Sequence, residues 1–254
     1  MVDLFFSDLD NTLIYSHRIK LPGDSVAVEY LNDHVQSYMT QKTYHFLRNQ
    51  KEFLLVPTTT RSVEQYDRLS DVFAEFGCRY ALVCNGGVLL NRNEVDQEWL
   101  KETKRIAGNE LRSLDEAGKW ILRRYPAQFV HLINDIMIYI KTETPAKDAD
   151  MLAGEVDLER INIYHDRNKV YCIPASITKG NALKRLSKQM GIDRSFAAGD
   201  SLTDISMLNR ADAAILPAEL SDAVDNQRKY VAGISGCFSD YICDVITKEL
   251  LNKR

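Results

Sequence analysis

Short apolar runs alternate with amphipathic stretches at both ends of the chain. Four or five consecutive apolar residues predict a buried strand, and apolar residues spaced three or four apart predict a helix. The strands predicted in this way cover residues 4–7, 53–57, 80–84, 195–198 and 213–216. The predicted helices cover residues 40–50, 63–76, 180–190, 204–210 and 240–252. This alternation predicts an α/β fold with a Rossmann-like, doubly wound parallel sheet.

The middle of the chain has a different pattern. Residues 96–117 are highly charged and have helical periodicity, and a second helix is predicted over 146–154. Predicted strands, separated by Asn and Asp residues that favour hairpin turns, lie within 128–134, 137–142 and 162–172. We therefore expect an inserted α+β cap domain over residues 89–171. The remaining core domain would be discontinuous and formed by residues 1–88 and 172–254.

A third pattern lies between the first strand and its helix. Residues 25–40, SVAVEYLNDHVQSYMT, alternate between apolar and polar side chains around Asn32-Asp33. This arrangement predicts a β-hairpin with a tight turn. The hairpin is either a surface decoration or, through residues 29–34, an element that determines specificity.

Composition excludes several classes of function. The 254 residues are 45% hydrophobic and 27% charged, as in a soluble globular protein, and the net charge of -4 gives no general attraction for nucleic acid or anionic membranes. The five cysteines are widely spaced without a CxxC pair, which argues against a disulfide framework or a zinc site. We see no signal peptide and no apolar run of membrane-spanning length. The expected protein is cytoplasmic, monomeric or homodimeric, and acts on a small molecule.

Chemically active side chains follow the ends of the predicted strands. Asp8 and Asp10 come directly after the first strand, and residues two apart on a strand point the same way. The segments VPTTTRS, NGG and GDSLTD follow three later strands. Each segment alone would also suit a turn or a helix cap. Their shared position favours one site, because ligands of open α/β sheets bind at the carboxyl edge of the strands.

The residue types at this edge indicate a metal and an anion. Carboxylates held close together repel one another unless a cation lies between them, and oxygen ligands suit Mg²⁺. Threonine hydroxyls, backbone N–H groups and Lys179, at the start of a predicted helix, suit a phosphate. A phosphate bound to Mg²⁺ satisfies both requirements.

The ordered motifs DLDNT, TTRS, TKG and GDSLTD resemble those of the haloacid dehalogenase superfamily of phosphohydrolases, and the resemblance covers the whole chain. The insert between the second and third motifs is similar to the type-two cap of the Cof-like and sucrose-phosphatase-like branch. Phosphomannomutases of the eukaryotic type share that cap class. The resemblance implies a Mg²⁺-dependent phosphatase that hydrolyses a small phosphorylated metabolite, with a sugar phosphate as the expected class, through an aspartyl-phosphate.

The resemblance also implies roles for single residues. Asp8 matches the nucleophile, and Asp10 the general acid/base, which also offers its backbone carbonyl to Mg²⁺. Lys179 matches the lysine of the third motif, which acts in catalysis and phosphate binding. Asp200 matches a direct Mg²⁺ ligand. Asp204 matches the second acid, which often acts through metal-bound water, so the expected metal residues are Asp8, Asp10, Asp200 and Asp204.

Phosphate and substrate contacts are expected from the second motif and from the third strand. Thr59 matches the phosphate-binding hydroxyl, although Thr58 competes for that role. Thr60 stands where many relatives have Gly. The other residues expected to bind phosphate or substrate are Arg61, Asn85 and Gly86.

Two positions depart from the family pattern. Asn11 replaces the Gly of Cof-like relatives, and Thr203 replaces the Asn of GDSxND. Both changes leave the chemistry intact and weaken a close analogy to any one substrate.

The alternative functions are a phosphomutase and a non-catalytic protein that binds a phosphorylated metabolite. Candidate leaving-group contacts in the cap, each of which is also an ordinary surface or turn residue, are Arg123, Arg124, His131 and Asn134.

Overall fold

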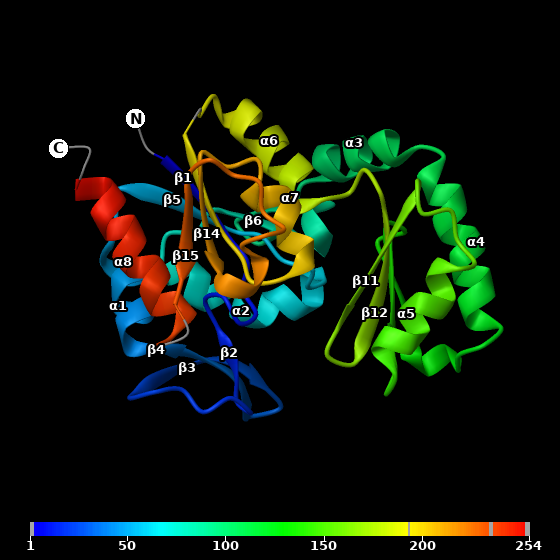
Figure 1. Cartoon of the computed structure of the whole chain (residues 1–254), viewed down its shortest axis with the longest axis horizontal. Helices are drawn as coiled ribbons and strands as arrows, with labels where there is room; N and C mark the ends of the chain where they lie inside the picture. Colours follow the sequence, from blue (N-terminus) through cyan, green and yellow to red (C-terminus); the bar gives the residue numbers. More distant parts are fainter. Residues whose placement is uncertain (1–2, 193, 234–235, 252–254) are drawn as a thin grey trace. The chain divides into compact units, whose positions relative to one another are not determined.

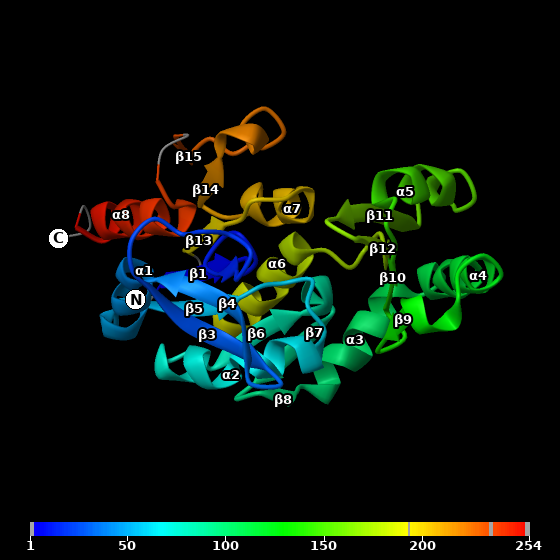
Figure 2. The same ribbon diagram turned by 90° about the horizontal axis from the view of Figure 1, so that it is seen from below.

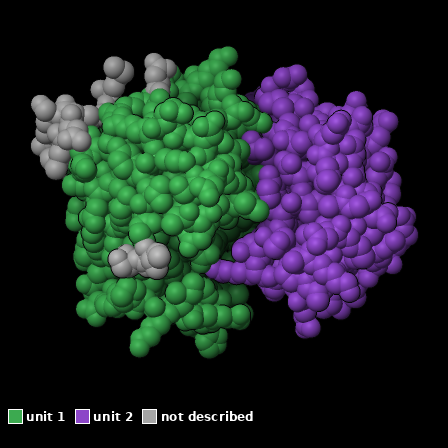
Figure 3. Space-filling model, in the orientation of Figure 1, with its two compact units in different colours: residues 1–95, 179–254 green, residues 96–178 purple. Residues whose placement is uncertain are grey.

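The computed structural model describes residues 3–192, 194–233 and 236–251. The chain forms two compact units, one of residues 1–95 and 179–254 and one of residues 96–178, called here the core unit and the inserted unit (Figure 3). The inserted unit thus begins at residue 96 rather than the expected 89 and ends at 178 rather than 171. The first boundary is later because strand β7 (Val88–Asn91) pairs with β6 (Tyr80–Val83) of the core unit.

The core unit is built on a parallel sheet (Figure 1), in which the strands have the order β15-β14-β13-β1-β5 (Figure 2). Strand β1 pairs in parallel with strands on both of its sides, and all five of its residues are buried. This burial explains its continuous apolar sequence, which is typical of a strand covered on both faces. The strand bounds are β1 Asp3–Ser7, β5 Phe53–Pro57, β13 Ser195–Ala198, β14 Ala213–Pro217 and β15 Lys229–Ala232.

The parallel sheet differs from the sequence expectation in two ways. Strand β6 forms an antiparallel sheet with β7 and β8 (Glu94–Val95), and its link to the end of β5 is an isolated parallel bridge between Thr58 and Leu82. Strand β15 was not expected, because its residues at the sheet edge are half-exposed and carry no continuous apolar run. The parallel sheet of the core is otherwise as predicted.

The helices of the core unit begin where the sequence supplies a cap. Ser62 caps α2 in a reciprocal capping box with Gln65, and Thr40 accepts a hydrogen bond at the start of α1. Helix α1 contacts α8, and α6 contacts α7. The helix bounds are α1 Gln41–Asn49, α2 Val63–Glu75, α6 Lys179–Met190, α7 Ile205–Leu208 and α8 Phe238–Leu251. The predicted last helix extended to residue 252, which lies outside the described residues.

The predicted hairpin is confirmed. Strands β3 (Ser25–Leu31) and β4 (His34–Thr40) pair in antiparallel fashion, with a short strand β2 (Tyr15–Ser16) on the other side of β4. Asn32 and Asp33 form the turn with φ angles of 50° and 63°. The register shifts around Glu29, which marks a bulge in β3. Strand β3 contacts helix α2 of the same unit, so one side of the hairpin packs against the rest of the core unit (Figure 2).

The inserted unit has the predicted α+β composition. Its antiparallel sheet has the order β11-β12-β10-β9 and packs with its helices around a core that includes Ile121, Ile140 and Val170. The single helix expected over 96–117 is two helices, because Gly108 has a φ of 46° that ends the first. The bounds are α3 Gln97–Ala107, α4 Glu110–Leu122, β9 Val130–Ile133, β10 Met137–Lys141, α5 Pro145–Ala153, β11 Ile161–Asp166 and β12 Lys169–Pro174.

A search for membrane spans covered all helices in the described part of the chain. None of them is both long enough and apolar enough to cross a bilayer.

Candidate active site

A tight turn after β1 positions the first two acids. The carbonyl of Leu9 accepts hydrogen bonds from the backbone N–H groups of residues 12–14 at 2.9–3.2 Å. Asn11 has a φ of 60°, a left-handed conformation that Gly and Asn adopt more easily than other residues. Asn11 can therefore stand where relatives carry Gly, and the turn holds Asp8 and Asp10 beside the sheet edge.

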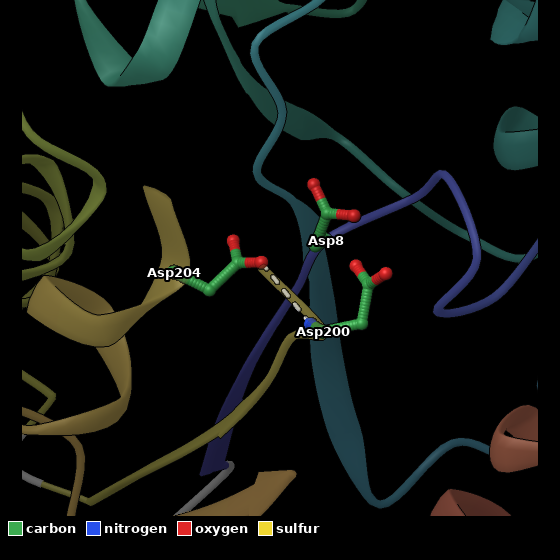
Figure 4. Close-up of side chains that lie close together, drawn as sticks. All are labelled: Asp8, Asp200 and Asp204. Carbon is green, nitrogen blue, oxygen red and sulfur yellow. Dashed lines mark hydrogen bonds between the residues drawn. The ribbon is translucent and has the colours of Figure 1, made fainter. Parts of the chain in front are cut away.

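Three acids converge at this edge. Asp8, Asp200 and Asp204 each place one carboxylate oxygen within 4.8 Å of the others (Figure 4). Asp8 and Asp200 follow the neighbouring strands β1 and β13, which explains why residues 192 positions apart in the sequence meet. The carboxylate of Asp10 lies outside this cluster of acids. The structure therefore brings together three of the four acids that the sequence indicated.

Lys179 lies between two of these acids. Its ammonium nitrogen is 2.5 Å from Oδ1 of Asp8 and 2.6 Å from Oδ1 of Asp204, and all three side chains are buried. Burial alone would lower the pKa of Lys179, but the charges of Asp204 and Asp8 raise it overall, so the lysine stays charged. One cation for three carboxylates leaves excess negative charge inside the protein. A divalent cation would compensate that charge.

Burial and the negative charge of the neighbouring acids shift the pKa of Asp8. Burial raises the pKa of Asp8 well above its usual range, Lys179 opposes this change, and the charges of Asp204 and Asp200 add to it. The ionised form that a nucleophile requires is therefore unfavourable in the metal-free protein. A cation beside Asp8 would restore it.

Asp204 organises the loop that carries Asp200. Its Oδ2 accepts hydrogen bonds from the backbone N–H groups of Asp200 and Ser201 at 3.1 and 3.0 Å, and from the Ser201 hydroxyl at 2.9 Å. A Cβ atom on Gly199 would come within 2.4 Å of the Asp204 side chain, so only glycine allows this close approach. Both oxygens of Asp204 thus have donors in the protein, which suits an indirect role at a metal.

Asp200 has fewer partners and a strongly shifted pKa. Its Oδ1 accepts a hydrogen bond from the Thr12 hydroxyl at 3.1 Å, a contact that sequence reasoning missed. Burial, together with the charge of Asp204, raises the pKa of Asp200 to about 7, against the opposing effect of Lys179. Asp200 is therefore an acid whose charge changes near neutral pH, and a bound metal would favour its ionised form.

This shift predicts how the stability of the metal-free protein depends on pH. The pKa of Asp200 is higher in the folded protein than in the unfolded chain, so folding favours its protonated form. The stability of the wild type relative to Asp200→Asn should then fall as the pH rises from about 4 to about 7, by on the order of 2–4 kcal/mol. Urea unfolding in EDTA at several pH values measures this difference. The exposed variant Asp222→Asn serves as a control, and an equal pH dependence for both variants would contradict the prediction.

The loop after β5 distinguishes between the two candidate threonines. The hydroxyl of Thr58 donates to the carbonyl of Val56 at 3.0 Å and so uses its proton within the protein. The hydroxyl of Thr59 instead accepts a hydrogen bond from the backbone N–H of Arg61 at 3.1 Å. Its own proton can therefore be donated to an anion, which favours Thr59 over Thr58. Thr60 follows in the same loop and is half-buried.

Asn85 and Gly86 lie next to this loop. The backbone N–H of Asn85 donates to the carbonyl of Thr59 at 2.9 Å, and that of Cys84 donates to the carbonyl of Arg61 at 2.8 Å. Cys84–Gly86 form a short 3-10 helix that is buried throughout. The segment thus supports the threonine loop through its backbone, and a contact with phosphate or substrate stays a prediction for both residues.

Arg61 has protein partners for its whole guanidinium group. It bonds to Asp10 through Nε at 2.8 Å and Nη2 at 2.9 Å, and to Glu29 through Nη1 at 2.9 Å and Nη2 at 3.0 Å. A further bond joins Nη1 to the carbonyl of Gln65 at 3.3 Å. We expected Arg61 to bind phosphate or substrate, but this arrangement directs its five N–H bonds to protein acceptors. Sequence reasoning included Glu29 in the candidate specificity segment 29–34 but missed its pairing with Arg61. The signal for a buried partner is a lone acid within the apolar run VAVEYL.

The residues expected to contact the leaving group make contacts within the inserted unit. The guanidinium of Arg124 lies 3.8 Å from the centre of the Trp120 ring. His131 stacks on Tyr139 with ring centres 4.5 Å apart, and Asn134 adopts a φ of 49° in the turn between β9 and β10. Arg123 is the exposed C-cap residue of α4. Their contribution to substrate binding stays a prediction.

The family is identified by its sequence model. Residues 49–235, most of the chain, match the model of the haloacid dehalogenase-like hydrolases. The chain belongs to this family of hydrolases. No curated protein matches the chain in sequence. The matched segment contains Thr59, Lys179, Asp200 and Asp204, and Asp8 precedes it.

Solved structures of family members share the fold. A sucrose-phosphatase from Synechocystis sp. PCC6803, determined with sucrose and phosphate, is 19% identical with a TM-score of 0.64, covering 98% of both chains. A putative HAD/Cof-like hydrolase from Plasmodium vivax is 12% identical with a TM-score of 0.71, covering 98% of this chain and 96% of its own. A sugar phosphatase of HAD subclass IIB is 13% identical with a TM-score of 0.58, covering 98% and 99%. The expected likeness to the Cof-like and sucrose-phosphatase-like hydrolases is confirmed.

Proposed function

We propose that this hydrolase is a Mg²⁺-dependent phosphatase that acts on a small phosphorylated metabolite through an aspartyl-phosphate on Asp8. The observation that carries the proposal is the cluster of Asp8, Asp200, Asp204 and Lys179 at the carboxyl edge of the sheet. The carboxylates of this cluster suit a cation, and Lys179 suits an anion. A metal-bound phosphate ester supplies both.

The donor set fits magnesium. Asp8 and Asp200 would bind the ion directly with the backbone carbonyl of Asp10, and Asp204 would act through a water molecule, because its oxygens already accept hydrogen bonds. Oxygen-only ligands with a net negative charge are the set that Mg²⁺ prefers. When bound, Mg²⁺ would neutralise the charge that otherwise keeps an anionic ester away from Asp8.

Four residues of the chain would then each have a role in the reaction. A carboxylate oxygen of Asp8 attacks phosphorus, and the bond to the ester oxygen breaks as Asp10 donates a proton to that oxygen. Lys179 and the Thr59 hydroxyl hold the remaining phosphate oxygens. Asp10 next takes a proton from a water molecule, which attacks phosphorus and releases inorganic phosphate from Asp8.

We propose a sugar phosphate as the substrate class. The likeness to a sucrose-phosphatase and to a subclass IIB sugar phosphatase supports this choice. The inserted unit is proposed as the cap that contributes contacts to the leaving group. A cytoplasmic location and a monomeric or homodimeric state are also proposed. The five free thiols are in keeping with a reducing compartment.

A phosphate-release screen tests the proposal. The panel contains sugar phosphates, nucleotides, pyridoxal phosphate and phosphoglycolate, each with Mg²⁺ and with EDTA. We expect release from at least one sugar phosphate, lowered at least about 100-fold by EDTA because Asp8 then lacks its counter-charge. An isomeric sugar phosphate formed without free phosphate would indicate a mutase. Ester binding without any turnover would indicate a non-catalytic binding protein.

A further inference from the structure

We propose that Glu29, on the hairpin strand β3, is a positioning residue for Asp10 and acts through the guanidinium of Arg61. The inference rests on the proposed function, because it assigns Asp10 the proton transfers of phosphate-ester hydrolysis. It gives the hairpin a mechanistic role that neither its sequence pattern nor its position in the chain indicates.

Arg61 joins the two carboxylates through two separate edges. The edge formed by Nε and Nη2 binds both oxygens of Asp10, and the edge formed by Nη1 and Nη2 binds both oxygens of Glu29. The guanidinium group is planar, so two bidentate pairs hold both carboxylates in fixed orientations relative to that plane. The orientation of Asp10 is therefore tied to the position of Glu29.

Glu29 is held firmly enough to serve as the anchor. Its Oε1 accepts hydrogen bonds from Arg61 and from Nε of Arg68 at 2.9 Å, and its Oε2 accepts from Arg61 and from the Ser37 hydroxyl at 2.6 Å. Each carboxylate oxygen of Glu29 thus accepts hydrogen bonds from two donors. Burial alone would raise the pKa of Glu29, but the bonds and charge of Arg61, with Ser37 and Arg68, lower it overall. Glu29 thus stays ionised.

The bulge in β3 determines this placement. Glu29 pairs across the hairpin with Ser37, at the point where the strand register shifts on both sides of Glu29. A bulge re-aims a side chain relative to regular alternation. Glu29 is consequently buried in a strand whose tip residues Tyr30 and Leu31 are exposed.

The exposed fraction of the side chains increases from Glu29 through Arg61 to Asp10. The side chain of Glu29 is 2% exposed, that of Arg61 11% and that of Asp10 33%. Charges alternate along the same path from Arg68 through Glu29 and Arg61 to Asp10, so each buried charge has an opposite neighbour. This arrangement is a rigid, buried support for a carboxylate that must itself stay accessible to a substrate and to water.

The experiment uses two esters of similar size with different leaving groups. Benzyl phosphate releases an alcohol that needs a proton from Asp10, whereas 4-nitrophenyl phosphate releases a stable phenolate. The parameter measured is kcat/KM, which reports the steps up to departure of the alcohol. The variant is Glu29→Gln, which keeps the shape but places an amide donor against the donors of Arg61.

We expect Glu29→Gln to lower kcat/KM for benzyl phosphate by about 10- to 100-fold, because a misplaced catalytic group typically costs that much. The value for 4-nitrophenyl phosphate should change by less than about threefold. Inhibition by inorganic phosphate should stay the same, because Lys179 and Thr59 hold the phosphate. Equal loss for both esters in a folded variant, or no loss for either, would overturn the proposal.

Two further variants separate the possible outcomes. Asp222→Asn changes an exposed residue that takes no part in these contacts, and it should leave both values within about threefold of the wild type. Arg61→Lys keeps a positive charge but cannot form two bidentate pairs, so it should reproduce the benzyl phosphate defect. It also provides the test if Glu29→Gln does not fold, and an Arg61→Lys enzyme without that defect would overturn the proposal.

The proposed function is tested separately by the same assays. Wild-type turnover of 4-nitrophenyl phosphate that disappears in Asp8→Asn supports the phosphatase, and Asp10→Asn should show a leaving-group effect larger than that of Glu29→Gln. A wild type without any turnover would refute the phosphatase itself. An Asp10→Asn variant without the leaving-group effect would refute the role of Asp10. A normal Glu29→Gln enzyme beside a defective Asp10→Asn enzyme would refute only the role of Glu29.

Discussion

Replacing Asp8 with asparagine should abolish phosphate release, with a loss of at least about 10⁴-fold in kcat, because removing a nucleophile removes the covalent pathway entirely. The amide cannot form the aspartyl-phosphate, yet the proposed phosphate contacts Lys179 and Thr59 and the proposed metal ligand Asp200 remain in place. Calorimetric titration with inorganic phosphate and Mg²⁺ should therefore still detect binding. Steady-state phosphate release from the best sugar phosphate of the screen measures the loss.

The same variant should stay folded. Asp8 is buried beside Asp204 and Asp200, so neutralising it relieves repulsion while Lys179 keeps its bond to Asp204. Thermal unfolding in EDTA should occur within about 3 °C of the wild type. The exposed variant Asp222→Asn is the matched control and should retain full activity. A folded Asp8→Asn enzyme with more than about 1% of wild-type turnover would contradict the nucleophile assignment.

Replacing Lys179 with methionine should destabilise the metal-free protein by about 3–5 kcal/mol at pH 7, because it leaves Asp8 and Asp204 buried without their shared cation. Catalysis should fall at least about 100-fold, since the lysine is also proposed to hold a phosphate oxygen. Mg²⁺ should restore part of the lost stability, because it compensates the same charges. Urea unfolding with EDTA and with Mg²⁺ measures both effects.

Lys42→Met is the matched control for this variant. Lys42 pairs with Asp244 at 2.7 Å, a distance close to that of the Lys179 pairs, but both partners are exposed. A pair of this kind contributes at most about 1 kcal/mol. If the two substitutions destabilised the protein equally, Lys179 would not be compensating a buried excess of negative charge.

Much of the fold followed from local patterns. Buried parallel strands produce continuous apolar runs, so β1, β5, β13 and β14 were predictable from hydrophobicity. The antiparallel pairing of β6 with the next strand β7 was not predicted, because the expected start of the insert at residue 89 lies within β7. The break at Gly108 was also missed, since helical periodicity continues through it although the backbone does not.

The order of the elements along the chain is enough to place several candidate groups at one edge of the sheet. Asp8, Thr59 and Asp200 each follow a strand of a parallel sheet, and the carboxyl ends of such strands share one edge. This consequence of topology can be deduced from the order of the elements. It is also why short motifs far apart in the chain indicated a single metal and phosphate site.

The pairing of these groups depends on the folded chain. Lys179 is shared by two acids, and Arg61 bridges two carboxylates. The Thr58 hydroxyl donates its proton to the carbonyl of Val56, whereas the Thr59 hydroxyl accepts a hydrogen bond and has its proton available for a ligand. Hydrogen-bond partners depend on side-chain direction to within a few tenths of an ångström. A bulge such as that at Glu29 changes this direction, and hydrophobic alternation does not predict the contacts that result. The type of chemistry is therefore encoded in local motifs, and the assignment of partners within the site is a property of the folded chain.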